Sequence, residues 1–129
     1  AQLKAAEKEV ADLRAKTPAA VRFEVWRGVY RVPADTDILV QATSIGLYPD
    51  VEGMPPVDLS AAPAHMLVSD VVFNPPETRL LAAARARGLP TLDGLSMLVY
   101  QGAIGFEMWT GEKAPEAVMK RALAEALGV

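Results

Sequence analysis

Short apolar runs alternate along this chain with longer segments of helical period, and this alternation narrows the folds open to it. Strands are predicted where apolar residues alternate with polar ones or form short runs, at residues 21–26, 38–40, 66–73 and 90–92. Helices are predicted where apolar residues recur every three or four positions, at residues 3–16, 75–87, 95–110 and 115–127. Strand–helix alternation with short connections predicts an α/β fold, with a parallel sheet and helices on both of its faces.

Composition excludes several classes of protein. The 129 residues, 51% of them apolar, suffice for one compact domain. The net charge of −3 argues against a nucleic-acid partner and an anionic membrane surface, and no apolar run approaches the roughly 18 residues of a membrane span. The absence of cysteine removes disulfides and thiolate chemistry and suits a cytoplasmic location, and a single histidine cannot build a His-rich metal site, so no metal is expected. Ala1 already lies in a helical pattern, and we therefore expect a longer protein whose earlier half precedes it.

Small, polar and glycine residues follow three of the predicted strands. They are the segments 43–46 (TSIG), 73–74 (FN) and 93–94 (DG). In open parallel sheets ligands bind beyond the carboxyl ends of the strands, and glycine permits a close approach of backbone to ligand. We therefore expect a ligand at this edge. Asn74 is also predicted to cap the helix that begins at Pro75.

Two polar side chains stand out in apolar surroundings. The predicted helix 95–110 is apolar on nearly every side and is expected to be buried, yet Gln101 lies in its middle, on one face with Met97 and Met108. Burying an amide without a partner costs about 1–3 kcal/mol, so Gln101 either has a partner in the core or faces a polar ligand. Asp70 lies inside an apolar strand, where hydrogen bonding to nearby backbone is favoured over catalysis.

Three segments together resemble a known family. They read DILVQATSIG at 37–46, DVVFNPPETRLL at 70–81 and DGLSMLVYQGAIGFEMWTG at 93–111. In order and spacing they are similar to the carboxy-terminal half of the shikimate/quinate dehydrogenases, which depend on a nicotinamide cofactor. The resemblance covers residues 37–127, and its wording is closer to the quinate/shikimate branch than to the strictly shikimate branch.

The resemblance implies a Rossmann-type sheet with strand order 3-2-1-4-5-6. Residues 21–26 would be strand three, and 37–43, 66–73 and 90–92 would be strands four to six. Strands one and two would lie upstream of Ala1 and would pair between strands three and four, so the sheet of this chain would be incomplete. Residues 1–129 would then be the carboxy-terminal part of an NAD(P)-binding domain. The helices within 95–127 would pack toward a substrate domain that precedes it in the same protein.

The function implied is hydride transfer between NADP or NAD and a ring hydroxyl or ketone of shikimate or quinate. The positions that match the family's cofactor site are Thr43, Ser44, Val71, Phe73, Asn74, Gly94 and Met97. Gln101 matches the amide that binds substrate hydroxyls, and Phe73 also borders the substrate. No catalytic residue falls in this chain, because the family's catalytic lysine and aspartate belong to its amino-terminal domain. The glycine-rich G-x-G-x-x-G loop is also absent from these residues, and the choice between NAD and NADP is made upstream.

Three positions depart from the family pattern and leave alternatives open. Gln41 stands where asparagine is common, Phe73 lacks the hydroxyl of the usual tyrosine, and Ser96 replaces a common glycine. One alternative is a non-catalytic homologue that keeps the ligand cleft. Another is a related Rossmann oxidoreductase with a different substrate, such as a tetrahydrofolate or aminoshikimate enzyme.

Overall fold

A computed structural model describes residues 2–128, in two compact units that meet between Tyr30 and Arg31. The first unit holds helix α1 (Gln2–Lys16), which ends where the Thr17 hydroxyl donates to the Leu13 carbonyl oxygen at 2.8 Å. Residues 21–26 form no strand, so this part of the prediction was wrong. An alternating pattern becomes a strand only when its backbone groups find a partner strand, and none of the described segments pairs with these residues.

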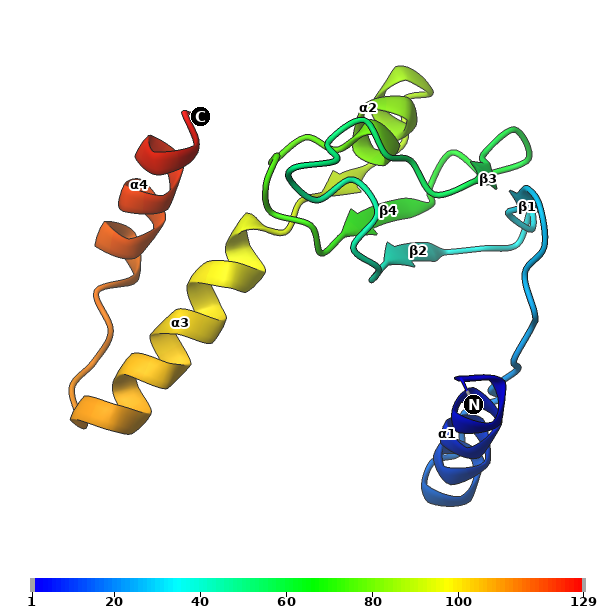
Figure 1. The fold of residues 1–129 in the computed structure, drawn as a ribbon, viewed down its shortest axis with the longest axis horizontal. Coiled ribbons are helices and arrows are strands. Elements are labelled where there is room, and N and C mark those ends of the chain that lie inside the picture. The colour runs from blue at the N-terminus through cyan, green and yellow to red at the C-terminus, as the bar shows by residue number, and fades with distance from the viewer. Residues whose placement is uncertain (1, 129) are drawn as a thin grey trace. The chain divides into compact units, whose positions relative to one another are not determined.

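The second unit is built on a parallel sheet (Figure 1). Its strands, in spatial order, are β2 (Ile38–Gln41), β4 (Leu67–Asp70) and β5 (Thr91–Leu92). Val68 in the central strand is paired with Leu39 on one side and Thr91 on the other. This order and direction agree with strands four, five and six of the predicted sheet, and each strand is shorter than predicted.

The chain also forms a second, two-stranded sheet. It pairs β1 (Tyr30–Arg31) with β3 (Val57–Asp58), and the Val32 N–H donates to the Asp58 carbonyl oxygen at 3.1 Å. Strand β3 lies within the connection 46–63, which contains four prolines.

Helix α2 (Arg79–Ala86) packs against β4 and β5, and its residues Leu80, Leu81 and Ala84 are buried. The buried stripe agrees with the prediction, but the start of the helix does not. Thr78 is the N-cap, and its hydroxyl accepts a hydrogen bond from the Leu81 N–H at 3.3 Å. Asn74 therefore does not cap the helix, because Thr78 is held in the cap position by a second buried partner described below.

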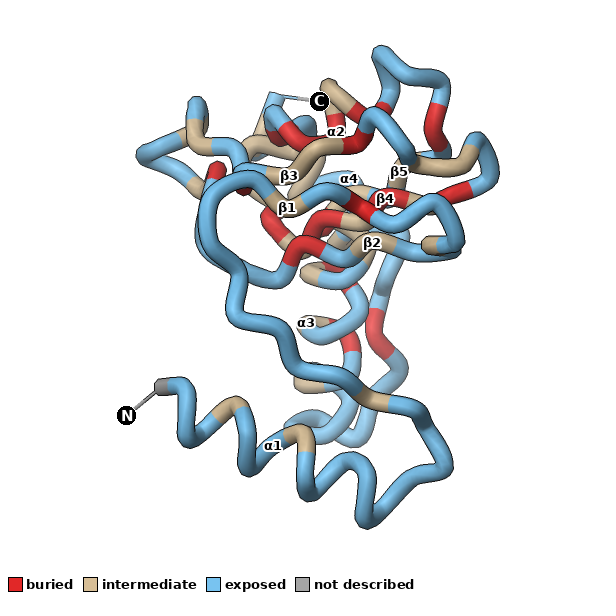
Figure 2. Tube along the Cα trace, turned by 90° about the vertical axis from the view of Figure 1, so that its right-hand side faces the viewer, coloured by how far each residue is buried: buried red, intermediate tan, exposed pale blue. Residues whose placement is uncertain are grey.

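The core lies between this sheet and α2, and Figure 2 shows its buried residues along β4 and α2. Met66, Val68, Leu80 and Leu81 are at most 1% exposed. Strand β2 differs from the prediction of a strand covered on both faces, because Ile38 is 58% exposed and Val40 55% exposed. These two side chains share one face of the strand, and among the described residues only α2 packs against this sheet, so that face has no cover.

Helices α3 (Leu95–Thr110) and α4 (Glu116–Leu127) pack against each other. Gly111, in the left-handed conformation at φ 72°, ends α3 as predicted. The predicted burial of α3 on all sides was wrong, since only Val99 and Ala103 are buried. α4 covers one side of α3, and the described chain offers nothing for the others. The large apolar side chains of α3 left exposed are Met97, Tyr100, Ile104, Phe106, Met108 and Trp109. No helix among residues 2–128 has the length and apolar character needed to cross a membrane.

Candidate functional site

The carboxyl ends of the three parallel strands lie at the same edge of the sheet, and backbone contacts join the segments that leave them. The Val71 N–H, just beyond β4, donates to the Gln41 carbonyl oxygen at the end of β2 at 3.0 Å. Gly94, beyond β5, lies against the carbonyl groups of Val71 and Val72. The predicted cofactor positions at Val71 and Gly94 are therefore neighbours in space.

Gly94 is required by this packing. A Cβ atom placed on it would lie 2.6 Å from the carbonyl oxygens of both Val71 and Val72, which is closer than real Cβ contacts come. The glycine at this position has a structural explanation that involves no ligand. The predicted role of Gly94 beside a nicotinamide ring is a separate matter and stays a prediction.

The segment after β2 is held by the side chain of Gln41, which is only 5% exposed. Its amide nitrogen donates to the Ile45 carbonyl oxygen at 3.0 Å, and its amide oxygen accepts from the Thr43 N–H. The Thr43 hydroxyl in turn accepts from the Ile45 N–H at 3.2 Å. Thr43 and Ser44 are thereby presented to solvent on a short loop whose two ends are tied to one amide.

Asp70 ends the central strand and is 1% exposed. Its Oδ1 atom accepts from the Val72 N–H at 2.9 Å and from Gln41 Nε2 at 3.2 Å, and its Oδ2 atom accepts from the Thr78 hydroxyl at 2.7 Å. The bond to Val72 confirms that Asp70 bonds nearby backbone. The parts of Gln41 and Thr78 in this arrangement were missed, although threonine ahead of a helix is a recognisable capping signal.

The remaining candidates lie in the segment after β4 and on α3. Phe73 and Asn74 are half-buried, and the Asn74 carbonyl oxygen accepts from the Tyr48 N–H at 2.8 Å. Met97, 47% exposed, and Gln101, also exposed, lie on α3 one helical turn apart. No hydrogen bond joins the Gln101 side chain to another described residue, and its role as a substrate ligand stays a prediction.

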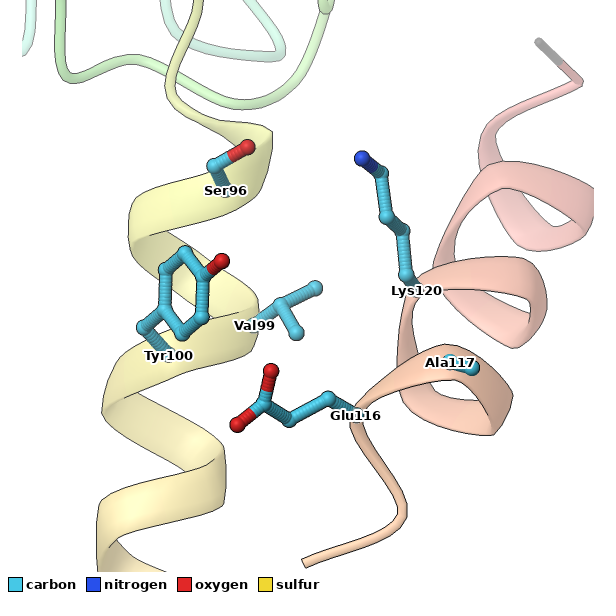
Figure 3. A pocket seen from close by; sticks show the side chains of 6 residues that line it. All are labelled: Ser96, Val99, Tyr100, Glu116, Ala117 and Lys120. Carbon is cyan, nitrogen blue, oxygen red and sulfur yellow. The ribbon is translucent and has the colours of Figure 1, made fainter.

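One hollow of about 240 Å³ lies between α3 and α4 (Figure 3). Its lining residues are Ser96, Val99, Tyr100, Glu116, Ala117 and Lys120. None of the predicted ligand-binding residues is among them. The hollow is the groove between two packed helices, on a different side of α3 from Met97 and Gln101.

The chemistry of these side chains fits one end of a dinucleotide. Hydroxyl and backbone groups at Thr43 and Ser44, and apolar side chains at Val71, Phe73 and Met97, suit a flat ring with an amide substituent. The glycine-rich turn G-x-G-x-x-G, which often holds the phosphate groups of a dinucleotide, does not occur in the sequence. No group of three or more side chains able to hold a metal ion was found among the residues described.

Comparison with known proteins decides the family. Residues 94–124 match the model of the shikimate 5'-dehydrogenase C-terminal domain. A shikimate dehydrogenase (NADP(+)) of Symbiobacterium thermophilum is 45% identical over 127 residues, which are 95% of this chain and 42% of that protein. The chain belongs to the shikimate dehydrogenase family, in its carboxy-terminal part. It spans less than half the length of these curated relatives, 42% of the protein from Symbiobacterium thermophilum and 32% of a relative from Methanopyrus kandleri.

Solved structures support the same relationship. The 5-ketofructose reductase of a Gluconobacter strain, in its ligand-free form, has a TM-score of 0.83 and 44% identity over 93% of this chain and 43% of its own. A shikimate 5-dehydrogenase from Thermus thermophilus, in complex with NADP(H) and shikimate, has a TM-score of 0.62 and 37% identity over 70% of this chain and 34% of its own. The Rossmann-type α/β class predicted for the chain is therefore confirmed.

Proposed function

We propose that this chain forms the nicotinamide-binding part of an oxidoreductase of the shikimate dehydrogenase type. The enzyme would transfer a hydride between NADP or NAD and a carbon that bears a hydroxyl or keto group on a polyhydroxylated ring such as shikimate or quinate. The observation that carries the proposal is the joining of three strand ends, at Gln41, Val71 and Gly94, in a chain 45% identical to a shikimate dehydrogenase over nearly its whole length.

The dinucleotide supplies the hydride, and the residues of this chain orient it. Thr43 and Ser44 would bind the cofactor from the loop after β2, while Val71, Phe73, Asn74 and Gly94 would form the wall behind its ring. Met97 would pack against the ring and keep water from that side, and Gln101 would donate from its amide to a substrate hydroxyl. Holding both reactants in the reactive geometry is the main contribution of the protein to such a hydride transfer.

The proton that accompanies the hydride needs a general acid or base. We assign that group, and the phosphate-binding loop, to an amino-terminal part of the same protein that also completes the substrate site. The exposed apolar side chains of α3 support this assignment, because an apolar patch left exposed is typical of an interface. We place the enzyme in the cytoplasm, which the lack of cysteine suits.

A second candidate substrate class follows from the comparisons. The structure with the TM-score of 0.83 belongs to a 5-ketofructose reductase, at nearly the same identity and coverage as the shikimate dehydrogenase of Symbiobacterium thermophilum. Phe73, which lacks a tyrosine hydroxyl, also favours a substrate site that differs from the common shikimate pattern. A keto-sugar reductase is thus the alternative that the experiment must separate.

The test is turnover by the full-length protein. Nicotinamide absorbance would be followed with shikimate and quinate in the oxidative direction and with 5-ketofructose in the reductive direction, each with NAD(H) and NADP(H). Turnover of shikimate or quinate supports the proposal, and turnover of 5-ketofructose alone supports the second candidate. Binding of a dinucleotide without turnover of any of them, measured by calorimetry, would contradict both candidates and leave a non-catalytic homologue or an oxidoreductase with a different substrate.

A further inference from the structure

Asp70 is a buried carboxyl group that the proposed hydride transfer does not use. Isolated carboxyl groups are rarely buried, because losing their hydration is costly unless each oxygen finds donors. Here both oxygens are supplied, by the Val72 N–H, the Gln41 amide and the Thr78 hydroxyl. These three donors share one property, which is their position at the ligand edge.

Each donor belongs to a different segment at the ligand edge. Gln41 ends β2, and its side chain holds the loop that carries Thr43 and Ser44. Val72 lies between Val71 and Phe73 in the segment after β4. Thr78 caps α2. The Asp70 side chain therefore joins the two segments expected to touch the cofactor and fixes the helix that follows them. We name Gln41, Asp70 and Thr78 the Asp70 network.

The network leaves little freedom in how its groups are arranged. The Gln41 amide has two acceptors on its nitrogen side, the Ile45 carbonyl oxygen and Asp70, and one donor on its oxygen side, the Thr43 N–H. Only this orientation of the amide satisfies all three. The Thr78 hydroxyl donates to Asp70 and accepts from the Leu81 N–H, so its proton is also committed. No buried side-chain polar atom in the described part of the chain lacks a partner.

We propose that Asp70 is a positioning residue for the cofactor site, acting through Gln41 and the Val72 N–H to set the Thr43–Ser44 loop against the Val71–Phe73 backbone. The inference rests on the proposed function. Fully satisfied buried networks are rigid, whereas removing one member leaves the others desolvated and unpaired. A misplacement of the segments by about 1 Å can cost about 100-fold in rate.

The test uses the full-length enzyme and measures dinucleotide affinity by titration, together with kcat and the thermal midpoint. Asp70→Ala removes all three acceptor contacts. Asp70→Asn has the same shape, but its amide group faces the Thr78 hydroxyl and cannot accept from it. Gln41→Glu places an oxygen where Nε2 now meets two acceptors, Ile45 O and Asp70 Oδ1. We expect Asp70→Ala and Gln41→Glu to weaken dinucleotide binding by about 10-fold or more, which is the effect of losing one hydrogen bond that positions the site. Asp70→Asn should weaken it by a smaller factor.

Met66→Ala is the matched control. Met66 is fully buried but precedes the opposite end of β4, so a cavity there lowers the thermal midpoint without reaching the ligand edge. We expect its dinucleotide affinity to stay within about 2-fold of the wild-type value at temperatures well below the midpoint. If the Asp70 and Gln41 variants lower only the midpoint, as this control does, Asp70 is structural and the proposal is overturned.

The outcome for the wild-type enzyme separates this proposal from the proposed function. A wild-type protein that binds no dinucleotide overturns both. A wild-type protein that binds it, with unchanged affinity in the three variants, overturns the positioning role alone. If Asp70→Ala does not fold, the comparison of Asp70→Asn and Gln41→Glu with Met66→Ala decides the matter.

Discussion

Gly94 and Val71 are in such close backbone contact that no side chain fits between them. A Cβ atom on Gly94 would lie 2.6 Å from the Val71 carbonyl oxygen, and its φ of −82° shows that space, rather than an unusual backbone conformation, demands the glycine. The contact joins the start of α3 to the segment that leaves β4. A change at Gly94 therefore acts on the site and on the fold together.

Gly94→Ala should lower the free energy of unfolding by about 1–3 kcal/mol, because the added methyl group must push backbone aside. It should also weaken dinucleotide binding, since Val71 and Val72 carry the displaced carbonyl groups. Chemical denaturation and a binding titration of the full-length protein measure both effects.

Gly102→Ala is the control for this change. Its Cβ would lie 3.0 Å from the terminal methyl group of Met119, which is the mobile end of a flexible side chain. Alanine is also better than glycine in the middle of a helix by about 0.5–1 kcal/mol. We expect Gly102→Ala to change stability by less than about 1 kcal/mol. Equal losses at the two glycines would contradict the backbone-contact explanation.

Gln101→Ala should raise the substrate KM of the full-length enzyme by about 10-fold, the loss of one hydrogen bond of about 1.4 kcal/mol. Gln101 is exposed in this chain and bonds to no described group, so the KM for the dinucleotide and the stability of this part should change little. Steady-state kinetics with varied substrate at saturating dinucleotide provide the measurement. Tyr100→Phe, at the neighbouring residue, which is also exposed, should leave the KM unchanged. An unaltered KM in Gln101→Ala would remove this amide from the substrate site.

The sequence pattern predicted the main sheet and the helix that packs on it, but it missed strands β1 and β3, which pair with each other and are only two residues long. Strands β2, β4 and β5 were found because their apolar runs pair with one another, and α2 because its apolar stripe packs on two of them. Residues 21–26 carry an equally good strand pattern and form none, because a strand is completed by its neighbour and pattern alone does not supply one.

The candidate site shows a second limit. Asn74 and Thr78 are both suited to cap α2, and the choice between them is made by Asp70, eight residues before Thr78, whose burial the sequence alone does not reveal. In the same way α3 has the composition of a buried helix, although α4 covers only one of its sides. The apolar composition of a helix therefore indicates that its surface needs a packing partner, and the structure shows whether the chain supplies that partner.

Asp58 should titrate below the usual carboxyl pKa of 3.8. The Ser60 hydroxyl and then the Ser60 N–H, at 2.8 Å, lower the pKa of Asp58, and Arg31 lowers it further. A carboxyl group whose pKa is lower in the folded state stabilises the fold above pH 3.8, and this contribution is lost as the pH falls through the lower folded value. The effect on stability is small, because the group is exposed to solvent.

NMR titration of the Asp58 carboxyl group measures that pKa directly. Ser60→Ala, which removes the hydroxyl and keeps the N–H, should bring the pKa of Asp58 back toward 3.8, and Arg31→Gln should shift it in the same direction. An unchanged pKa in both variants would contradict these two causes.

The exposed apolar face of α3 gives the sharpest test of the proposed amino-terminal partner domain. Met108 is 78% exposed in this chain, so Met108→Asp should leave the stability of the 129-residue chain within about 0.5 kcal/mol of the wild-type value. If the amino-terminal part of the full-length protein packs on this face, the same change buries an unpaired charge there, and the thermal midpoint should fall by several degrees. Lys113→Asp, in the exposed turn after α3, is the control and should have little effect in either protein. The 129-residue chain and the full-length protein differ only in the amino-terminal part that could cover this face. A small effect of Met108→Asp in both would mean that the face stays in water and that the partner domain packs elsewhere.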